Sequence, residues 1–280
     1  MSNLSYMQKA TDRGQLQIHV TTERGFFPIK DASIRLSYTG NPTEIIEELS
    51  TDISGQTAAV ELPAPPLEYS MEPSEFQPYS EYTIQVNASG YRPINISGIS
   101  VLPDKTSIQN VRMETATVEN PLERNIVITA NTLYGNFPPK IPEDEIKPMT
   151  ESGEIVLSRV VIPEYVIVHD GPPSDSSAND YYVRYRDYIK NVASSEIYAT
   201  WPDAALRANI LAIMSFTLNR VYTEWYRNKG YDFTITSSTA FDHKFVYGRN
   251  IFSNISNIVD EMFNSYLSRP NVRQPILTQY

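Results

Sequence analysis

The chain has 280 residues, of which 41% are hydrophobic and 20% are charged, which is enough to form the cores of two modest domains of about 100–200 residues each. Its net charge of −10 argues against nonspecific binding to nucleic-acid phosphates. The absence of cysteine excludes disulfides and thiolate metal sites, and the presence of only three histidines argues against a multi-histidine metal site. No apolar run reaches the roughly 18 residues of a membrane span, and the first residues lack the apolar core of a secretory signal.

Proline and charge divide the chain unevenly. Residues 1–150 hold 14 of the 20 prolines and carry 19 acidic and 11 basic side chains, a net charge of −8. The remaining 130 residues hold 6 prolines and carry 14 acidic and 12 basic side chains, a net charge of −2. This contrast predicts two different modules, and the fold class that we expect is a multidomain α+β protein.

The first module shows short runs in which apolar and polar residues alternate. The clearest runs are residues 16–20, 33–36 and 82–86, and turn-forming residues such as Gly25 and Gly55 separate them. An alternation with a period of two places one face of each strand on a core and the other face in water. Several short strands at this spacing predict a β-sandwich of about 100 residues.

The order of the motifs in this module resembles a known family. The motifs are Gly14 at the start of a strand, Pro-Ile-Lys-Asp-Ala at 28–32, Thr-Asp-Ile-Ser-Gly at 51–55 and an Ala-Ser-Gly-Tyr corner at 88–91. Together they resemble the carboxypeptidase regulatory-like, transthyretin-type sandwich over residues 14–114, after an N-terminal arm of residues 1–13. The resemblance implies a noncatalytic module that acts as a spacer or a folding partner.

Residues 115–159 are predicted to be a connector. Residues 137–145 mix prolines with acidic residues, a composition that favours an extended and exposed chain. Exposed linkers of this kind are where proteases cut. The apolar run at residues 124–129 can still pair as a strand with either neighbouring module.

Residues 160–280 show a different pattern. Residues 160–168 predict a strand, with its proline near the start or at a sheet edge. Three predicted helices follow: one over residues 187–196 with Asp187 as its N-cap, one that begins at Pro202 and stops at Gly230, and one over residues 253–267.

Glu196 lies between the first two of these helices and is followed within five residues by Tyr198 and Trp201. Aromatic faces give sugar rings a stacking surface, and burial among them raises the pKa of a carboxyl toward the range of a general acid. The alternative is that Glu196 caps the following helix or lies on a solvated face. Spacing alone favours this alternative.

The same segment resembles the signature of the SpoIID family, and this resemblance reverses that preference. The matching positions are Val192, Glu196, Trp201, Pro202, Ala205, Leu206 and Ala208, followed by Tyr231-Asp232 and Val246-Tyr247-Gly248. The resemblance covers about residues 160–280. It implies a lytic transglycosylase of peptidoglycan in which Glu196 is the single acid/base.

A single carboxylate suits that chemistry. Hydrolytic glycosidases typically use two carboxyl groups. In a lytic transglycosylase the C6 hydroxyl of the muramic acid is the internal nucleophile, so one glutamate can protonate the leaving oxygen and then accept the C6 proton. The product carries a 1,6-anhydro end.

The resemblance also implies substrate-binding roles for other side chains, each with a plainer alternative. They are Tyr198, Trp201, Arg207, Ser237, Ser238 and His243. Trp201 fits a hydrophobic contact at the start of a helix equally well, and for Arg207 we favour a surface cation. Asp203 and Glu224 are poorer candidates for the acid, because both fit roles at helix ends or surfaces.

No cofactor is expected. Some SpoIID proteins hold zinc with a histidine and cysteines in the loop that corresponds to about residues 231–245. Here that loop contains Asp242 and His243 but no cysteine, so no metal is predicted.

The combination of a sandwich, a connector and a SpoIID-like module most resembles clostridial spore cortex-lytic enzymes. It implies a precursor that an activating serine protease cuts in the connector and that acts on peptidoglycan glycan strands at the spore cortex or cell wall. Relatives continue beyond the position of Tyr280, so we expect the catalytic module to be incomplete here. Two alternatives stay open: a phage- or tail-associated wall hydrolase, and a noncatalytic wall-binding scaffold.

Overall fold

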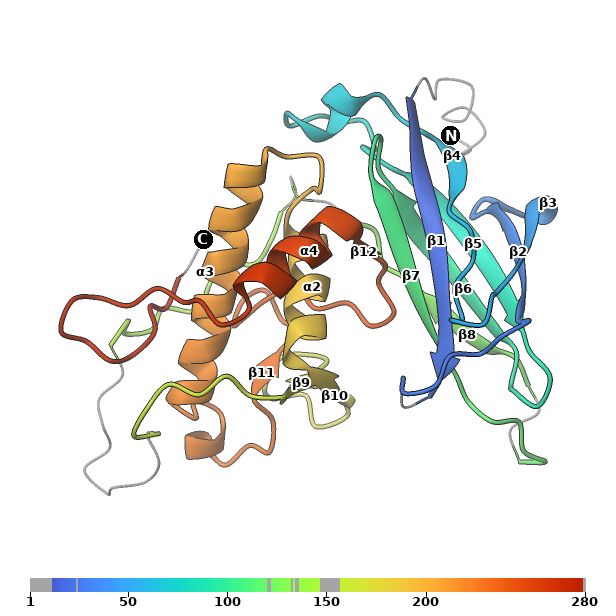
Figure 1. Cartoon of the computed structure of the whole chain (residues 1–280). Coiled ribbons are helices and arrows are strands. Elements are labelled where there is room, and N and C mark those ends of the chain that lie inside the picture. Colours follow the sequence, from blue (N-terminus) through green and yellow to red (C-terminus); the bar gives the residue numbers. More distant parts are fainter. Residues whose placement is uncertain are drawn as a thin grey trace. The chain divides into compact units, whose positions relative to one another are not determined.

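The structure is a computed structural model that describes residues 12–23, 25–119, 122–131, 133, 136–146 and 157–278. It mixes α and β structure, with several sheets and few helices, as Figure 1 shows. Its contacts divide the chain into two compact units. Unit 1 consists of Met1–Tyr134, Tyr198–Trp201 and Tyr247–Asn254, and unit 2 consists of Gly135–Ile197, Pro202–Val246 and Ile255–Tyr280.

Unit 1 contains a four-stranded sheet in the order β12-β7-β1-β4 and a five-stranded sheet in the order β3-β2-β5-β6-β8. The strands are β1 (Asp12–Thr22), β2 (Ser33–Tyr38), β3 (Asn41–Ser50), β4 (Val60–Ala64), β5 (Ser80–Asn87), β6 (Ile94–Val101), β7 (Thr106–Met113), β8 (Arg124–Val127) and β12 (Ile251–Phe252). A short 3-10 helix, η1 (Leu67–Ser70), follows β4.

The predicted alternation decides which side chains form the core of unit 1. On β1, Leu16, Ile18 and Val20 are fully buried, whereas the residues between them are not. β2 and β5 pair antiparallel and likewise bury Ile34 and Ile84. Because each strand turns one face inward, two sheets can enclose a common apolar layer.

The run at residues 124–129 pairs within unit 1. β8 lies parallel to β6, with Ile94 opposite Arg124 and Ser97 opposite Val127. Gly98 follows at a positive φ of 84°, and a Cβ there would lie 2.4 Å from the carbonyl oxygen of Ile128. Only glycine allows the two chains to approach so closely. The first part of the predicted connector is therefore a strand.

Two short segments from the second half of the sequence belong to unit 1. β12 pairs antiparallel with β7, with Ile251 opposite Ile108 and Phe252 opposite Ser107. Residues Tyr198–Trp201 form the other segment. The domain boundaries predicted from composition stay a prediction, since a division by contacts reports packed neighbours and does not identify parts that fold alone.

Unit 2 is built around a small sheet and one long helix. The sheet has the order β10-β9-β11. Its strands are β9 (Tyr165–His169), β10 (Asp180–Arg184) and β11 (Ile235–Thr236), and the other elements are α2 (Tyr185–Glu196), α3 (Asp203–Tyr222), the 3-10 helix η2 (Arg227–Lys229) and α4 (Ser253–Met262), which continues from β12 of unit 1. Every residue of α3 from Ile213 to Arg220 is buried, as expected for a helix at the centre of a domain.

Three predicted helix limits were wrong. Asp187 does not cap α2, which begins at Tyr185 without a side-chain cap. α3 ends at Tyr222, before Gly230, because Glu224 adopts a positive φ of 45°. Gly230 instead ends η2 in the left-handed conformation. α4 ends at Met262 and so is shorter than the predicted helix. Among the described residues, no helix combines the length and apolar character needed to cross a membrane.

Candidate functional site

Glu196 is the last residue of α2, and its carboxylate is held by a loop of unit 2, residues 237–246, which follows β11. Its Oε1 accepts a hydrogen bond from the backbone N–H of Lys244 at 2.7 Å. The residues before it, from Asn191 to Ser195, are buried, whereas Glu196 itself is partly exposed. The end of α2 therefore presents a carboxylate toward solvent with a fixed amide donor on one oxygen.

Asn191 fixes the same loop to α2. Its Oδ1 accepts the backbone N–H of Val246 at 3.0 Å, and its Nδ2 donates to the carbonyl of Val246 at 2.8 Å. The side chain thus pairs with the loop as a neighbouring strand would. We call this pair of hydrogen bonds the clamp. Because Lys244 is only two residues before Val246, the clamp also limits how far the Lys244 amide can move relative to the Glu196 carboxylate.

Asp242 anchors the other side of the loop. It is 0% exposed, and its Oδ1 accepts from Nε of Arg220 at 2.6 Å. Its Oδ2 accepts from the Tyr226 hydroxyl at 2.6 Å and from the Thr236 hydroxyl and amide at 2.7 and 2.8 Å. Arg220 is 1% exposed and also donates to Glu143 at 2.6 and 2.8 Å. Every charge in this group has a partner, which is the condition under which buried ions are tolerated.

The titratable rings beside the loop stay neutral. Burial raises the pKa of Tyr188 well above its usual value, and the Asp242 and Glu196 carboxylates add to this effect. Burial lowers the pKa of His243 well below its usual value, and the cations Lys140 and Arg220 lower it further. The Tyr188 hydroxyl and His243 Nδ1 lie 3.2 Å apart. His243 is therefore an uncharged packing residue at neutral pH.

The predicted substrate-binding residues of the loop make contacts within unit 2. His243 is 1% exposed and packs against Phe216, with ring centroids 4.5 Å apart. The amide of Ser237 donates to the His169 carbonyl at 2.8 Å, which continues the pairing of β11 with β9. The carbonyl of Ser238 accepts the amides of Phe241 and Asp242 at 3.0 and 2.7 Å. Their contact with sugar hydroxyls stays a prediction.

The other predicted residues, Arg207, Tyr198 and Trp201, each have a polar partner within their own unit. Arg207 is on the first turn of α3 and pairs with Asp203 at 2.7 Å and with Glu261 at 2.8 Å. In unit 1, Tyr198 is 3% exposed and its hydroxyl donates to the Asn131 carbonyl at 3.3 Å. Trp201 Nε1 donates to the Ser70 carbonyl at 2.9 Å. In this structure both aromatic side chains pack within unit 1.

Asn191, Lys140 and Asp242 are the residues of the site that the sequence did not assign. Asn191 carried a usable signal, because a polar side chain among the buried positions of a helix needs a hydrogen-bond partner. Asp242 and Lys140 carried none, since their partners lie far along the chain. In the described part of the chain, no group of three or more histidine, aspartate or glutamate residues could hold a metal ion.

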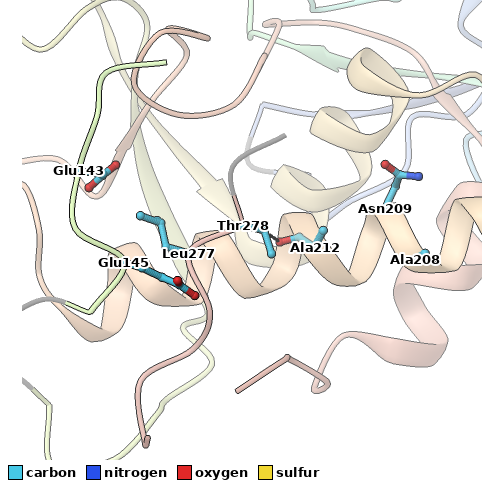
Figure 2. A pocket seen from close by; sticks show the side chains of 7 residues that line it. All are labelled: Glu143, Glu145, Ala208, Asn209, Ala212, Leu277 and Thr278. Atoms are coloured by element: carbon cyan, nitrogen blue, oxygen red, sulfur yellow. Dashed lines mark hydrogen bonds between the residues drawn. The ribbon is translucent and has the colours of Figure 1, made fainter. Parts of the chain in front are cut away.

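Unit 2 also has two hollows that do not include Glu196. Figure 2 shows the first, a pocket of about 670 Å³ with Ala208, Asn209 and Ala212 of α3 along it and Glu143 and Glu145 on a neighbouring segment. The second measures about 540 Å³, and its lining includes the aromatic side chains of Trp225, Tyr231 and Phe241 together with charged residues and prolines. Lys229 Nζ lies 3.2 Å above the Trp225 ring in this pocket.

Solved structures offer only weak similarity. The Bacillus anthracis TIE protein is 17% identical with a TM-score of 0.26, and the match covers 38% of this chain and 17% of that chain. The minor pilin GBS52 of Streptococcus agalactiae is 13% identical with a TM-score of 0.27, covering 38% and 46%. A catechol 1,2-dioxygenase of Acinetobacter radioresistens is 18% identical with a TM-score of 0.26, covering 45% and 60%. The chain thus spans less than two thirds of each of these proteins.

A family comparison is more informative. No curated protein matches the chain. Residues 178–261 match the family described as SpoIID, stage II sporulation protein. The matched range contains Glu196, the clamp residue Asn191 and the loop with Asp242 and Lys244. The part of unit 2 that builds the candidate site is therefore similar to the SpoIID family.

Proposed function

We propose that unit 2 cleaves the glycan strands of peptidoglycan, with Glu196 as the acid/base. The observation that carries the proposal is the partly exposed Glu196 carboxylate, which the Lys244 amide holds in place within the SpoIID-like range. The family similarity supports a cell-wall lytic function related to sporulation. The amide donor fixes the orientation of the carboxylate, and an oriented carboxylate can exchange a proton with a bound substrate.

The surroundings of Glu196 favour lytic transglycosylation over hydrolysis. The loop that holds Glu196 also carries the Asp242 carboxylate, which is fully buried and already accepts bonds on both oxygens. Asp242 therefore cannot act as the second carboxylate of a hydrolytic pair. Attack by the C6 hydroxyl of the muramic acid needs no second carboxylate, because the nucleophile belongs to the substrate.

The finer proposal is a spore cortex-lytic enzyme of the SleC type. In it, the transthyretin-like sandwich is a noncatalytic module, and a serine protease activates the precursor by a cut between residues 147 and 160 during germination. The protein would act at the spore cortex or cell wall. This proposal rests on the order of the sequence motifs. A phage- or tail-associated wall hydrolase and a noncatalytic wall-binding scaffold are the other candidates.

Product analysis separates these functions. Purified peptidoglycan is digested with the intact chain and with chain cut between residues 147 and 160, and the products are identified by mass spectrometry. The proposal predicts 1,6-anhydro ends, whereas reducing ends would identify a hydrolase and no release would favour a scaffold. A gain of activity after the cut supports the precursor, and equal activity before and after it contradicts that finer proposal.

A further inference from the structure

Residues 136–146, which we call the strap, run alongside the loop that holds Glu196. The amide of Ile141 donates to the Ala240 carbonyl at 2.8 Å, and Lys140 Nζ donates to the Asp242 carbonyl. The Phe137 ring lies 5.8 Å from Lys244 Nζ. Strap residues 137, 140 and 141 contact loop residues 244, 242 and 240 in turn, so the two segments run antiparallel. The sequence predicts an extended, exposed linker here. Most strap residues are exposed, but Lys140, Glu143 and Glu145 are partly buried, and the segment makes specific contacts with unit 2.

Charged contacts anchor the strap beyond Lys140. The Glu143 carboxylate accepts hydrogen bonds from both terminal nitrogens of Arg220, and its side chain is only 10% exposed. Glu145 pairs with Arg269, and its carbonyl accepts from Gln274 Nε2 at 2.9 Å. Removal of the strap would leave Arg220 buried with Asp242 as its only remaining carboxylate partner among the described residues. The strap is therefore a structural part of unit 2.

Lys140 brings the charge of the strap to Glu196. Its Nζ is bonded to the Asp242 carbonyl and lies 5.4 Å from the centroid of the Phe216 ring. Burial lowers the pKa of this ammonium, and the Glu196 and Asp242 carboxylates oppose that effect. The Asp242 carbonyl that Lys140 binds is two residues before Lys244, whose amide donates to Glu196, so the Lys140 ammonium and the Glu196 carboxylate contact the same short stretch of the loop.

Other ionisable groups lie on the segments around Glu196, and one of them is Lys244, whose Nζ lies 5.8 Å from the Phe137 ring of the strap. Arg220 of α3 is paired with Asp242 of the loop and with Glu143 of the strap. Tyr188 of α2 and His243 of the loop are uncharged at neutral pH for the reasons given above. Lys140 is the cation of the strap that acts on the Glu196 carboxylate.

We propose that Lys140 is a positioning residue for Glu196: it fixes the loop through the Asp242 carbonyl, and its charge favours the ionised carboxylate. The strap is then a permanent wall of the candidate site. A protease cut between residues 147 and 160 leaves the strap in place, because its contacts with unit 2 do not depend on the chain beyond residue 146. The inference deepens the proposed function, which assigns the acid/base role to Glu196.

The test follows the Lys244 amide by NMR, because its hydrogen bond to Glu196 makes its shift report the titration of that carboxyl. Lys140→Gln keeps a donor for the Asp242 carbonyl but loses the charge, and we expect the midpoint of the titration to rise by about one pH unit. Lys140→Arg should restore the midpoint of the unchanged protein. Glu145→Gln, a strap change at the Arg269 pair, should leave the midpoint unchanged. An unchanged midpoint in Lys140→Gln overturns the proposal.

A reciprocal measurement keeps the test decisive if changes at Lys140 prevent folding. The side-chain nitrogen of Lys140 is titrated in the unchanged protein and in Glu196→Gln. Loss of the Glu196 charge should lower the midpoint for Lys140, and equal midpoints would overturn the proposal. Neither measurement needs turnover, so a protein that fails to cleave peptidoglycan would contradict the proposed function and leave the role of Lys140 to be judged separately.

Discussion

Two carboxylates of unit 2 touch the same loop but have opposite surroundings. Asp242 is fully buried, and arginine, tyrosine and threonine donors occupy both of its oxygens. Glu196 is partly exposed and is oriented by the amide of Lys244. The comparison shows how environment assigns roles to chemically similar groups. Asp242 maintains the structure of the loop, and Glu196 is the group that we propose exchanges a proton with a substrate.

Asp242→Asn is expected to have the largest effect on stability. It leaves Arg220 buried beside a neutral amide, so we expect unfolding to become easier by about 3 kcal/mol or more. Chemical denaturation measures this loss. Glu145→Gln is the matched control, since its pair with Arg269 is solvent-exposed and should contribute less than about 1 kcal/mol. A loss in Asp242→Asn as small as that of the control would contradict the structural role.

Asn191→Ala tests how the loop is held at Glu196. It removes both hydrogen bonds to Val246, and we expect a loss of about 2 kcal/mol. Hydrogen exchange at the Val246 amide should become faster in this variant. Asn209→Ala, which removes a bond to the Ala205 carbonyl within α3, is the control. Equal exchange at Val246 in both variants would show that Asn191 does not fix the loop.

His243→Gln tests whether the buried histidine beside Asp242 makes stability depend on pH. The pKa of His243 is lowered in the folded protein, so between about pH 6.5 and that lowered value the unfolded chain binds more protons. Stability is therefore lost as the pH falls below about 6.5, with a slope of up to about 1.4 kcal/mol per pH unit from this residue. Denaturation across this range should show a shallower slope in His243→Gln. Identical slopes would mean that folding does not lower the pKa of His243.

The sequence predicted those parts of the molecule that depend on local pattern. Alternation located the buried faces of β1, β2 and β5, and the SpoIID-like frame located Glu196. The helix end at Tyr222 was missed, because Gly230 carries the residue type that favours left-handed backbone and Glu224 does not. The packing of Tyr198 in unit 1 was missed because it depends on a partner 67 residues away.

The surroundings of Glu196 were beyond prediction for a related reason. The Lys244 amide that donates to it is 48 residues away, and a backbone amide has no signature in the sequence. Lys140 belongs to a proline- and acid-rich segment whose composition is typical of exposed linkers. Its docking on unit 2 arises from specific partners, chiefly Arg220 for Glu143, which composition does not reveal.

The most direct test of the central claim is the release of anhydro-muropeptides by Glu196→Gln. This variant keeps a side chain of the same shape but cannot supply the proton. Glu261→Gln, which changes an exposed partner of Arg207, serves as the control. We predict that Glu196→Gln lowers the rate by at least about 100-fold with its thermal unfolding unchanged, and that the control retains full activity. Full activity in a folded Glu196→Gln protein would contradict the account.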